Sequence, residues 1–215
     1  MIHRRGALRT ATAAIAAAAF AVTGLAGHAS AQDKEPITFA LLQDFTGVYT
    51  FVSNEYNQGQ QDYIKMVNAT GGVNGHPIDL IVRDTGNEPQ RGIEAYNRAV
   101  EEGAVLVDFL STPVSRAMVP RVLEDEVVMI TALHGRGDAS DGEVFPYVFP
   151  MMATYWSQAA VLANYIEENM GGLEGKKIAH VFIDSPFGRE PLPILEELAE
   201  RKGFEVKAFP YPSPG

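Results

Sequence analysis

From residue 37 onward, the spacing of apolar residues alternates between a period of two and a period near 3.6. A period of two indicates a strand, and a period near 3.6 indicates a helix with one buried face. The pattern predicts four strands, at 37–42, 78–82, 104–110 and 127–131. Between them it predicts three helices, at 55–68, 89–100 and 113–123. Strands that alternate with helices favour an α/β fold in which helices cover both faces of a parallel sheet.

Glycine and proline mark the ends of these helices. Gly71 and Gly72 follow the first helix, where a residue with a free backbone commonly ends a helix. Pro89 stands at the expected start of the second helix, because the first turn does not need its missing N–H. Pro120 is expected to kink the third helix or to mark its late boundary.

A second unit begins near residue 150. Residues 147–150 are expected to form a short extended segment, which we take as the boundary between a unit at 32–149 and a unit at 150–215. The pattern beyond it predicts helices at 154–170 and from about Pro191, and strands at 178–183 and 204–209. An open parallel sheet usually has about five or six strands. We therefore expect the second unit to be incomplete and the chain to be truncated at its C-terminal end.

The first 31 residues have the three parts of a secretory signal. Arg4, Arg5 and Arg9 come first, an uncharged Ala-rich run at 11–27 follows, and Ala29, Ser30 and Ala31 offer the small residues of a cleavage site. A membrane anchor is the alternative, but the run is shorter and less apolar than the ~20 residues that a span requires. We expect cleavage after Ala31 and a periplasmic protein. The general secretory route is favoured over the twin-arginine route.

Composition excludes several kinds of chemistry. The chain has no cysteine, so disulfides, thiolate metal sites and cysteine nucleophiles are excluded. Its net charge of −10 argues against a nucleic-acid partner, which needs clustered Lys and Arg. The histidines lack the spacing of a helical metal site, and no glycine motif has the context of a nucleotide-binding loop. No metal and no cofactor are therefore expected.

The candidate binding residues lie in loops at the carboxyl ends of the predicted strands, where open α/β sheets bind ligands. Polar and aromatic residues fill loops 43–51, 111–113, 132–135 and 184–189. The candidates are Tyr49, Ser111, Thr112, Ala132, Leu133, His134 and Phe187.

Each of these positions also has a purely structural interpretation. Ser111 and Thr112 begin a helix, where a hydroxyl either caps backbone N–H groups or, with them, binds an anion. Phe187 either stacks on a ligand or packs at the start of the next helix. Asp184 is expected to hold its own turn with Ser185, and Trp156 is expected in the core.

Several stretches resemble one known family. They are Phe45-Thr46-Gly47, the helix end Val67-Asn68-Ala69-Thr70-Gly71-Gly72-Val73-Asn74-Gly75, residues 78–84, Leu123-Glu124-Asp125-Glu126 and Asp184-Ser185-Pro186-Phe187-Gly188. Together they make the chain similar to the periplasmic solute-binding proteins of ABC importers, in the branched-chain amino-acid class. The resemblance runs from about residue 37 to the end of the chain.

This resemblance implies a type I periplasmic binding fold, with two α/β lobes that close on a small ligand. It places the ligand carboxylate at Ser111 and Thr112, further contacts at Ala132, Leu133 and His134, and an aromatic contact at Phe187. It also implies an ABC permease as the partner and no catalysis. The family often has Ser or Thr where His134-Gly135 stands, and Tyr where Phe187 stands. An amino acid, another small carboxylate and an amide all stay open as ligands.

Two other functions stay open on the sequence. A ligand-sensing subunit would use the same two lobes to signal. An exported hydrolase would need a nucleophile beside a base, or two convergent acids, and no such pairing is visible along the sequence.

Overall fold

The computed structural model describes residues 34–131 and 135–212. The predicted signal at 1–31 lies outside these residues. Within them, no helix combines the length and the apolar character needed to cross a bilayer.

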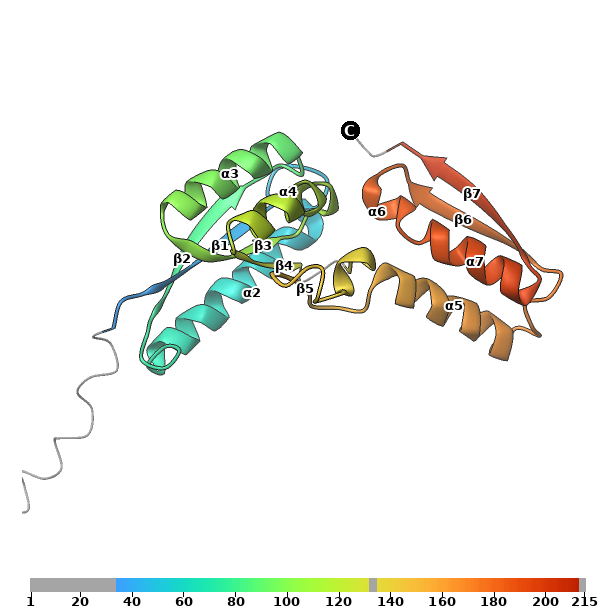
Figure 1. Ribbon diagram of the computed structural model, residues 1–215, viewed down its shortest axis with the longest axis horizontal. Coiled ribbons are helices and arrows are strands. Elements are labelled where there is room, and N and C mark those ends of the chain that lie inside the picture. Colours follow the sequence, from blue (N-terminus) through green and yellow to red (C-terminus); the bar gives the residue numbers. More distant parts are fainter. Residues whose placement is uncertain (1–33, 132–134, 213–215) are drawn as a thin grey trace, which may run out of the picture.

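The first unit is built on a parallel five-stranded sheet with the order β2-β1-β3-β4-β5 (Figure 1). Its strands are β1 (Ile37–Gln43), β2 (Ile78–Asp84), β3 (Ala104–Phe109), β4 (Val128–Thr131) and β5 (Val148–Pro150). The four predicted strands are confirmed. The short extended segment expected at 147–150 is confirmed, and it adds a fifth strand to the sheet, because Val148 to Pro150 pair with Met129 to Thr131. Three residues that end in proline are too few to show strand periodicity.

Helices cover both faces of this sheet, as the sequence predicts (Figure 1). They are α2 (Thr50–Ala69) on one face, and α3 (Pro89–Glu101) and α4 (Thr112–Glu124) on the other. Helix α2 begins before the predicted start at residue 55. The hydrophobic pattern did not reveal its first turn, because that turn has no buried apolar face: Phe51 is 77% exposed. Pro120 lies inside α4 and does not end it.

The main hydrophobic core lies between the first sheet and the pair α3 and α4. Its largest fully buried members include Tyr96, Phe109, Met118 and Met129. Tyr96 and Phe109 pack with their ring centroids 6.4 Å apart. Burying large apolar side chains contributes about 1.5–3 kcal/mol each, so this core is the main source of stability in the first unit.

The second unit holds a two-stranded parallel sheet of its own. Its elements are α5 (Tyr155–Asn169), β6 (Lys177–Ile183), α6 (Pro186–Arg189), α7 (Leu192–Lys202) and β7 (Glu205–Tyr211), and a short 3-10 helix, η1 (Asp138–Ser140), precedes β5. A separate small core forms around Ala163, Leu173 and Phe204. Helix α6 was not expected. It is a single turn, too short to show helical periodicity.

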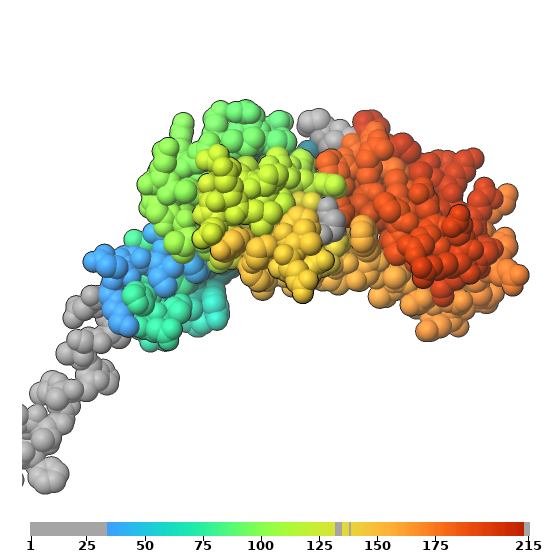
Figure 2. All heavy atoms as spheres, in the orientation of Figure 1, coloured from blue at the N-terminus to red at the C-terminus, as the bar shows by residue number. Residues whose placement is uncertain are grey.

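The two units touch along one seam, where α4 approaches α6 (Figures 1 and 2). They have separate sheets and separate hydrophobic cores. The division into 32–149 and 150–215 remains a prediction.

Candidate functional site

The loop after β1 is held in shape by the buried side chain of Asp44. Its two carboxylate oxygens accept hydrogen bonds from the backbone N–H groups of Gly47, at 2.6 Å, and Tyr49, at 2.9 Å. Burial raises the pKa of the Tyr49 phenol, and the charge of Asp44 raises it further. Tyr49 is therefore a neutral group on a fixed backbone, able to offer a hydroxyl and an aromatic face.

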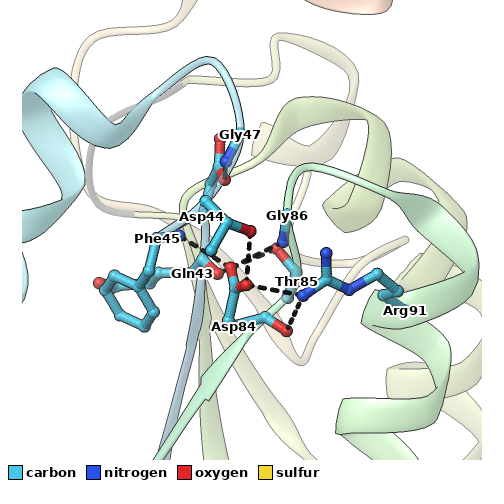
Figure 3. A network of polar contacts seen from close by, with 9 residues as sticks. Gln43, Asp44, Phe45, Gly47, Asp84, Thr85, Gly86 and Arg91 are labelled. Carbon is cyan, nitrogen blue, oxygen red and sulfur yellow. Dashed lines mark hydrogen bonds and ion pairs between the residues drawn. The ribbon is translucent and has the colours of Figure 1, made fainter.

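A second carboxylate fixes the same loop from β2 (Figure 3). Asp84 accepts hydrogen bonds from the backbone N–H of Phe45, at 2.8 Å, and the hydroxyl of Thr46, at 2.6 Å. It also accepts from the N–H of Gly86, at 2.9 Å, and from Arg91, at 2.6 Å. The loops that follow β1 and β2 are thus tied together at the carboxyl end of the sheet.

Helix α2, which follows this loop, is anchored through buried Asp108 on β3. The carboxylate of Asp108 accepts hydrogen bonds from Gln43 at 2.9 Å, Gln60 at 2.7 Å and Tyr56 at 3.0 Å. Burial and the charge of Asp108 raise the pKa of Tyr56. The sequence pattern places Tyr56 on an apolar helix face; in the structure its hydroxyl instead joins a polar cluster that fixes the helix.

Ser111 and Thr112 differ in their roles at the start of α4. Ser111 is the N-cap: its hydroxyl oxygen accepts from the backbone N–H of Val114, at 3.3 Å, and its hydroxyl donates to Asn87, at 2.6 Å. Thr112 is the first residue of the helix and is also buried. Its hydroxyl lies close enough to the phenol of Tyr155 on α5, across the seam, to lower the pKa of that phenol.

Tyr155 is the residue on which the predicted site converges. Burial raises the pKa of its phenol, the nearby hydroxyl of Thr112 lowers it, and Tyr49 and Glu190 raise it further. Its ring meets Phe187 edge to face, with centroids 5.3 Å apart. Of the residues predicted from three separate loops, Phe187 therefore packs against Tyr155, and Tyr49 and Thr112 lie close enough to affect its pKa.

The sequence reasoning did not select Tyr155. The feature of the sequence that could have identified Tyr155 is its position, because it is the first residue of the first helix after the predicted boundary between the units. A side chain in that position lies next to the passage of the chain from one sheet to the other.

The candidates Ala132, Leu133 and His134 lie outside the described residues. Gly135, which follows them, is placed: its carbonyl accepts a hydrogen bond from the N–H of Tyr155, at 2.8 Å. A side chain at Gly135 would come within 2.4 Å of the Ala153 carbonyl, so only glycine fits against this crossover.

The loop that carries Phe187 has a different internal arrangement from the one expected. Asp184 does not hold the turn with Ser185; it forms an ion pair with Arg189. Ser185 is the N-cap of α6, where its side chain accepts from the N–H of Gly188 at 3.4 Å. Both contacts hold the single turn of α6, and with it Phe187, against the end of β6.

Trp156 is not a core residue, contrary to expectation. It is 37% exposed, and its indole N–H donates to the main-chain carbonyl of Glu190, at 3.0 Å. Its helical spacing is the same as that of a core residue, but it lies on the side of α5 that faces the seam.

An apolar cavity of about 440 Å³ lies beside this site, between α5 and β6. Tyr155 and Phe187 line one part of it, and residues of α5, β6 and α7 together with Tyr211 line the rest. Every residue that lines this cavity belongs to the second unit. The candidate site is the cluster around Tyr155, because it combines polar and aromatic groups from both units.

Metal coordination has no visible basis in residues 34–131 and 135–212, where no group of three or more His, Asp or Glu side chains could hold an ion. The site offers hydroxyls, aromatic rings and backbone groups. This set can bind and orient a small molecule.

Comparison with known proteins identifies the family of the chain. Residues 36–215 match the family described as periplasmic binding protein. The chain belongs to this family. The α/β class and the parallel sheets expected from the sequence are confirmed.

Individual relatives are similar over most of this chain. The Leu/Ile/Val-binding protein homolog 3 of Brucella melitensis is 27% identical over 175 residues, which are 81% of this chain and 46% of that protein. A solved structure from the Pseudomonas fluorescens group, titled as an ABC transporter permease, is 37% identical, with a TM-score of 0.71 over 84% of this chain and 45% of that one. A fatty acid ABC transporter substrate-binding protein from Thermomonospora curvata is 26% identical, with a TM-score of 0.74 over 85% of this chain and 46% of that one. The chain thus spans about half the length of the relatives it matches.

Proposed function

We propose that this chain belongs to a periplasmic solute-binding protein that captures a small carboxylate between its two units and delivers it to an ABC permease. The observation that carries the proposal is that Tyr155 packs against Phe187 in the second unit and lies close enough to Tyr49 and Thr112 of the first unit for them to affect its pKa. These side chains come from three helices, α4, α5 and α6, and from the loop before α2. A ligand held there would contact both units at once, and it would stabilise their closed arrangement.

The carboxylate is supported by the helix end and by the names of the relatives. The N-terminus of α4 carries a partial positive charge that favours an anion, and Thr112 stands in its first turn. The Brucella relative is named for amino acids and the Thermomonospora protein for a fatty acid, and both ligand classes carry a carboxylate. Phe187 offers an aromatic face and no hydroxyl, so we do not restrict the ligand to α-amino acids.

Thermal unfolding of the full-length protein tests this proposal. Leucine, valine, octanoate and benzoate would be compared with leucinamide, octanamide and benzamide. The amides keep the shape of the corresponding acids and lack the negative charge of the carboxylate. A ligand that binds only the folded state at 100 times its Kd adds about 2.7 kcal/mol, and the melting temperature should rise by several degrees. Calorimetric titration would then measure the Kd.

The outcomes separate the parts of the proposal. Stabilisation by amides and not by acids would contradict the carboxylate assignment and keep the binding function. No stabilisation and no heat of binding across the panel would contradict the binding function itself. Stimulation of a permease's ATPase activity by the loaded protein would favour import over sensing.

A further inference from the structure

Glu190 is a buried acid at the seam between the two units. It follows the last residue of α6, and its side chain is only 4% exposed. Removing a carboxylate from water costs several kcal/mol unless close partners compensate for the lost hydration. The groups that compensate Glu190 therefore matter for how the two units sit together.

The carboxylate oxygens of Glu190 are bound by groups of the first unit. One oxygen accepts from the guanidinium of Arg116 on α4, at 2.9 Å, and the other accepts from the backbone N–H of Gly137, at 3.1 Å. Arg116 and Glu190 are 74 residues apart in the chain. Each contact exists only while the units are in contact at the seam.

The main chain of Glu190 is fixed from its own unit. Its carbonyl accepts from the indole of Trp156, at 3.0 Å, and that indole lies directly on Gly137, where an added Cβ would be 2.5 Å from the ring. Trp156 thus presses against the same backbone segment that donates to the carboxylate. The contact is tightly packed and has a defined geometry.

We propose that Glu190 is a latch between the units, which stabilises their closed arrangement and so raises ligand affinity without contacting the ligand. When the units separate, water replaces Arg116 and the Gly137 N–H around the carboxylate. The free energy of the latch is the difference between these two environments, and it adds to the closure driven by ligand. The link to affinity rests on the proposed function; the effect on closure does not.

Variants that remove one charge test the latch. Glu190→Gln keeps the shape and loses the ion pair, and Arg116→Gln removes the partner. Glu197→Gln is the matched control, because Glu197 pairs with Arg201 inside α7, away from the seam. A double-mutant cycle of Glu190→Gln with Arg116→Gln measures whether the two residues act together.

Two readouts are needed, one of them without ligand. These 215 residues contain no cysteine, so Asn97→Cys on α3 and Glu168→Cys on α5 give one dye pair that reports the distance between the units, once any cysteine elsewhere in the full-length protein is replaced by serine. In the ligand-free full-length protein, Glu190→Gln and Arg116→Gln should each shift the population toward larger separation, and Glu197→Gln should not. Each seam variant should also weaken binding of the carboxylate found by thermal unfolding about tenfold, with the double variant no weaker than either single one.

Other results would overturn the latch. Unchanged separation in both seam variants would do so, whether or not a ligand is found. Weaker binding in Glu190→Gln alone, only for ligands with an ammonium group and with separation unchanged, would make Glu190 a ligand contact instead. If Glu190→Gln fails to fold, as judged by circular dichroism, Arg116→Gln decides the test, because that side chain is 40% exposed.

Discussion

At the scale of single residues, Asp84 shows how one carboxylate organises the approach to the site. Partial burial pushes its pKa upward, but the hydrogen bonds from Thr46, Phe45, Gly86 and Arg91 outweigh burial and lower the pKa to about 2. The charged form is therefore favoured in the folded protein more than in the unfolded chain, where an Asp has a pKa near 3.9.

A pH dependence follows from this lowered pKa. The stabilisation by Asp84 should be complete above about pH 4 and should disappear as the pH falls toward about 2. Asp84→Asn should reduce the free energy of unfolding at neutral pH by about 1 kcal/mol, a value discounted for solvent screening, and the deficit should shrink in acid. Denaturant unfolding at several pH values measures this.

The control for this prediction is Asp79→Asn. Asp79 is an exposed residue of the same strand and should show a much smaller deficit at neutral pH. A deficit of Asp84→Asn that stayed constant from pH 7 to pH 2 would show that the carboxylate charge is not what stabilises the loop.

Thr112 allows a residue-scale test of the binding site. Thr112→Val removes a hydroxyl that lies near the phenol of Tyr155 and keeps the shape, so it should weaken ligand binding by about five- to tenfold. Thr70→Val, at the exposed end of α2, removes a hydroxyl that bonds only to its own helix and should leave the Kd unchanged. Equal Kd values for Thr112→Val and the unmodified protein, measured by calorimetry, would restrict Thr112 to a structural role.

At the scale of secondary structure elements, the packing of α3 on α4 depends on one glycine. An added Cβ at Gly92 would lie 2.3 Å from a methyl group of Val114, so the two helices meet where no side chain fits. Gly59, in the exposed part of α2, has no atom within 4 Å of an added Cβ. Both glycines are helical, but only Gly92 is in close contact with a neighbouring helix.

This contrast gives opposite predictions for the same substitution. Gly92→Ala should lower the free energy of unfolding by about 1–3 kcal/mol, because the helices must separate or Val114 must shift. Gly59→Ala should raise it by about 0.5–1 kcal/mol through a lower entropy of the unfolded chain. Thermal melts of the two variants make the comparison, and destabilisation by Gly59→Ala would contradict it.

At the scale of the whole molecule, two separate cores are joined by a polar seam. Inter-unit contacts of this kind favour relative motion of the units, because the two cores formed by residues 34–131 and 135–212 share no member. The backbone passes between the units next to the seam, from β5 to α5. The candidate site and the proposed latch therefore respond to the same motion.

Ligand binding should consequently make the full-length protein more compact. Small-angle X-ray scattering with saturating ligand should give a smaller radius of gyration than scattering without it, because the ligand favours the closed arrangement. Addition of an amide that fails to bind is the control. Tight binding with no change in radius would show that the site does not depend on closure.

The local pattern of apolar residues was enough to predict most strands and helices and the parallel character of the sheet. These features depend on neighbouring residues and on the periods of helix and strand, which are properties of short segments. The prediction gave β5 only as a short extended segment and missed α6, because both are shorter than the window in which a period can be recognised. Tyr49 and Thr112 were predicted as site residues because the carboxyl ends of parallel strands meet at one edge of a sheet, and Phe187 was predicted because it follows a strand of the second sheet.

The sequence alone thus determined the elements, their order and the loops that carry the candidate site. Only the tertiary structure decided that Tyr155 lies at the centre of that site, that Trp156 faces the seam, and that Glu190 binds Arg116. The physical reason is distance along the chain. Periodicity indicates which face of a helix or strand is buried. The residues that pack against that face are distant in the sequence, and only the three-dimensional arrangement of the two units brings them together.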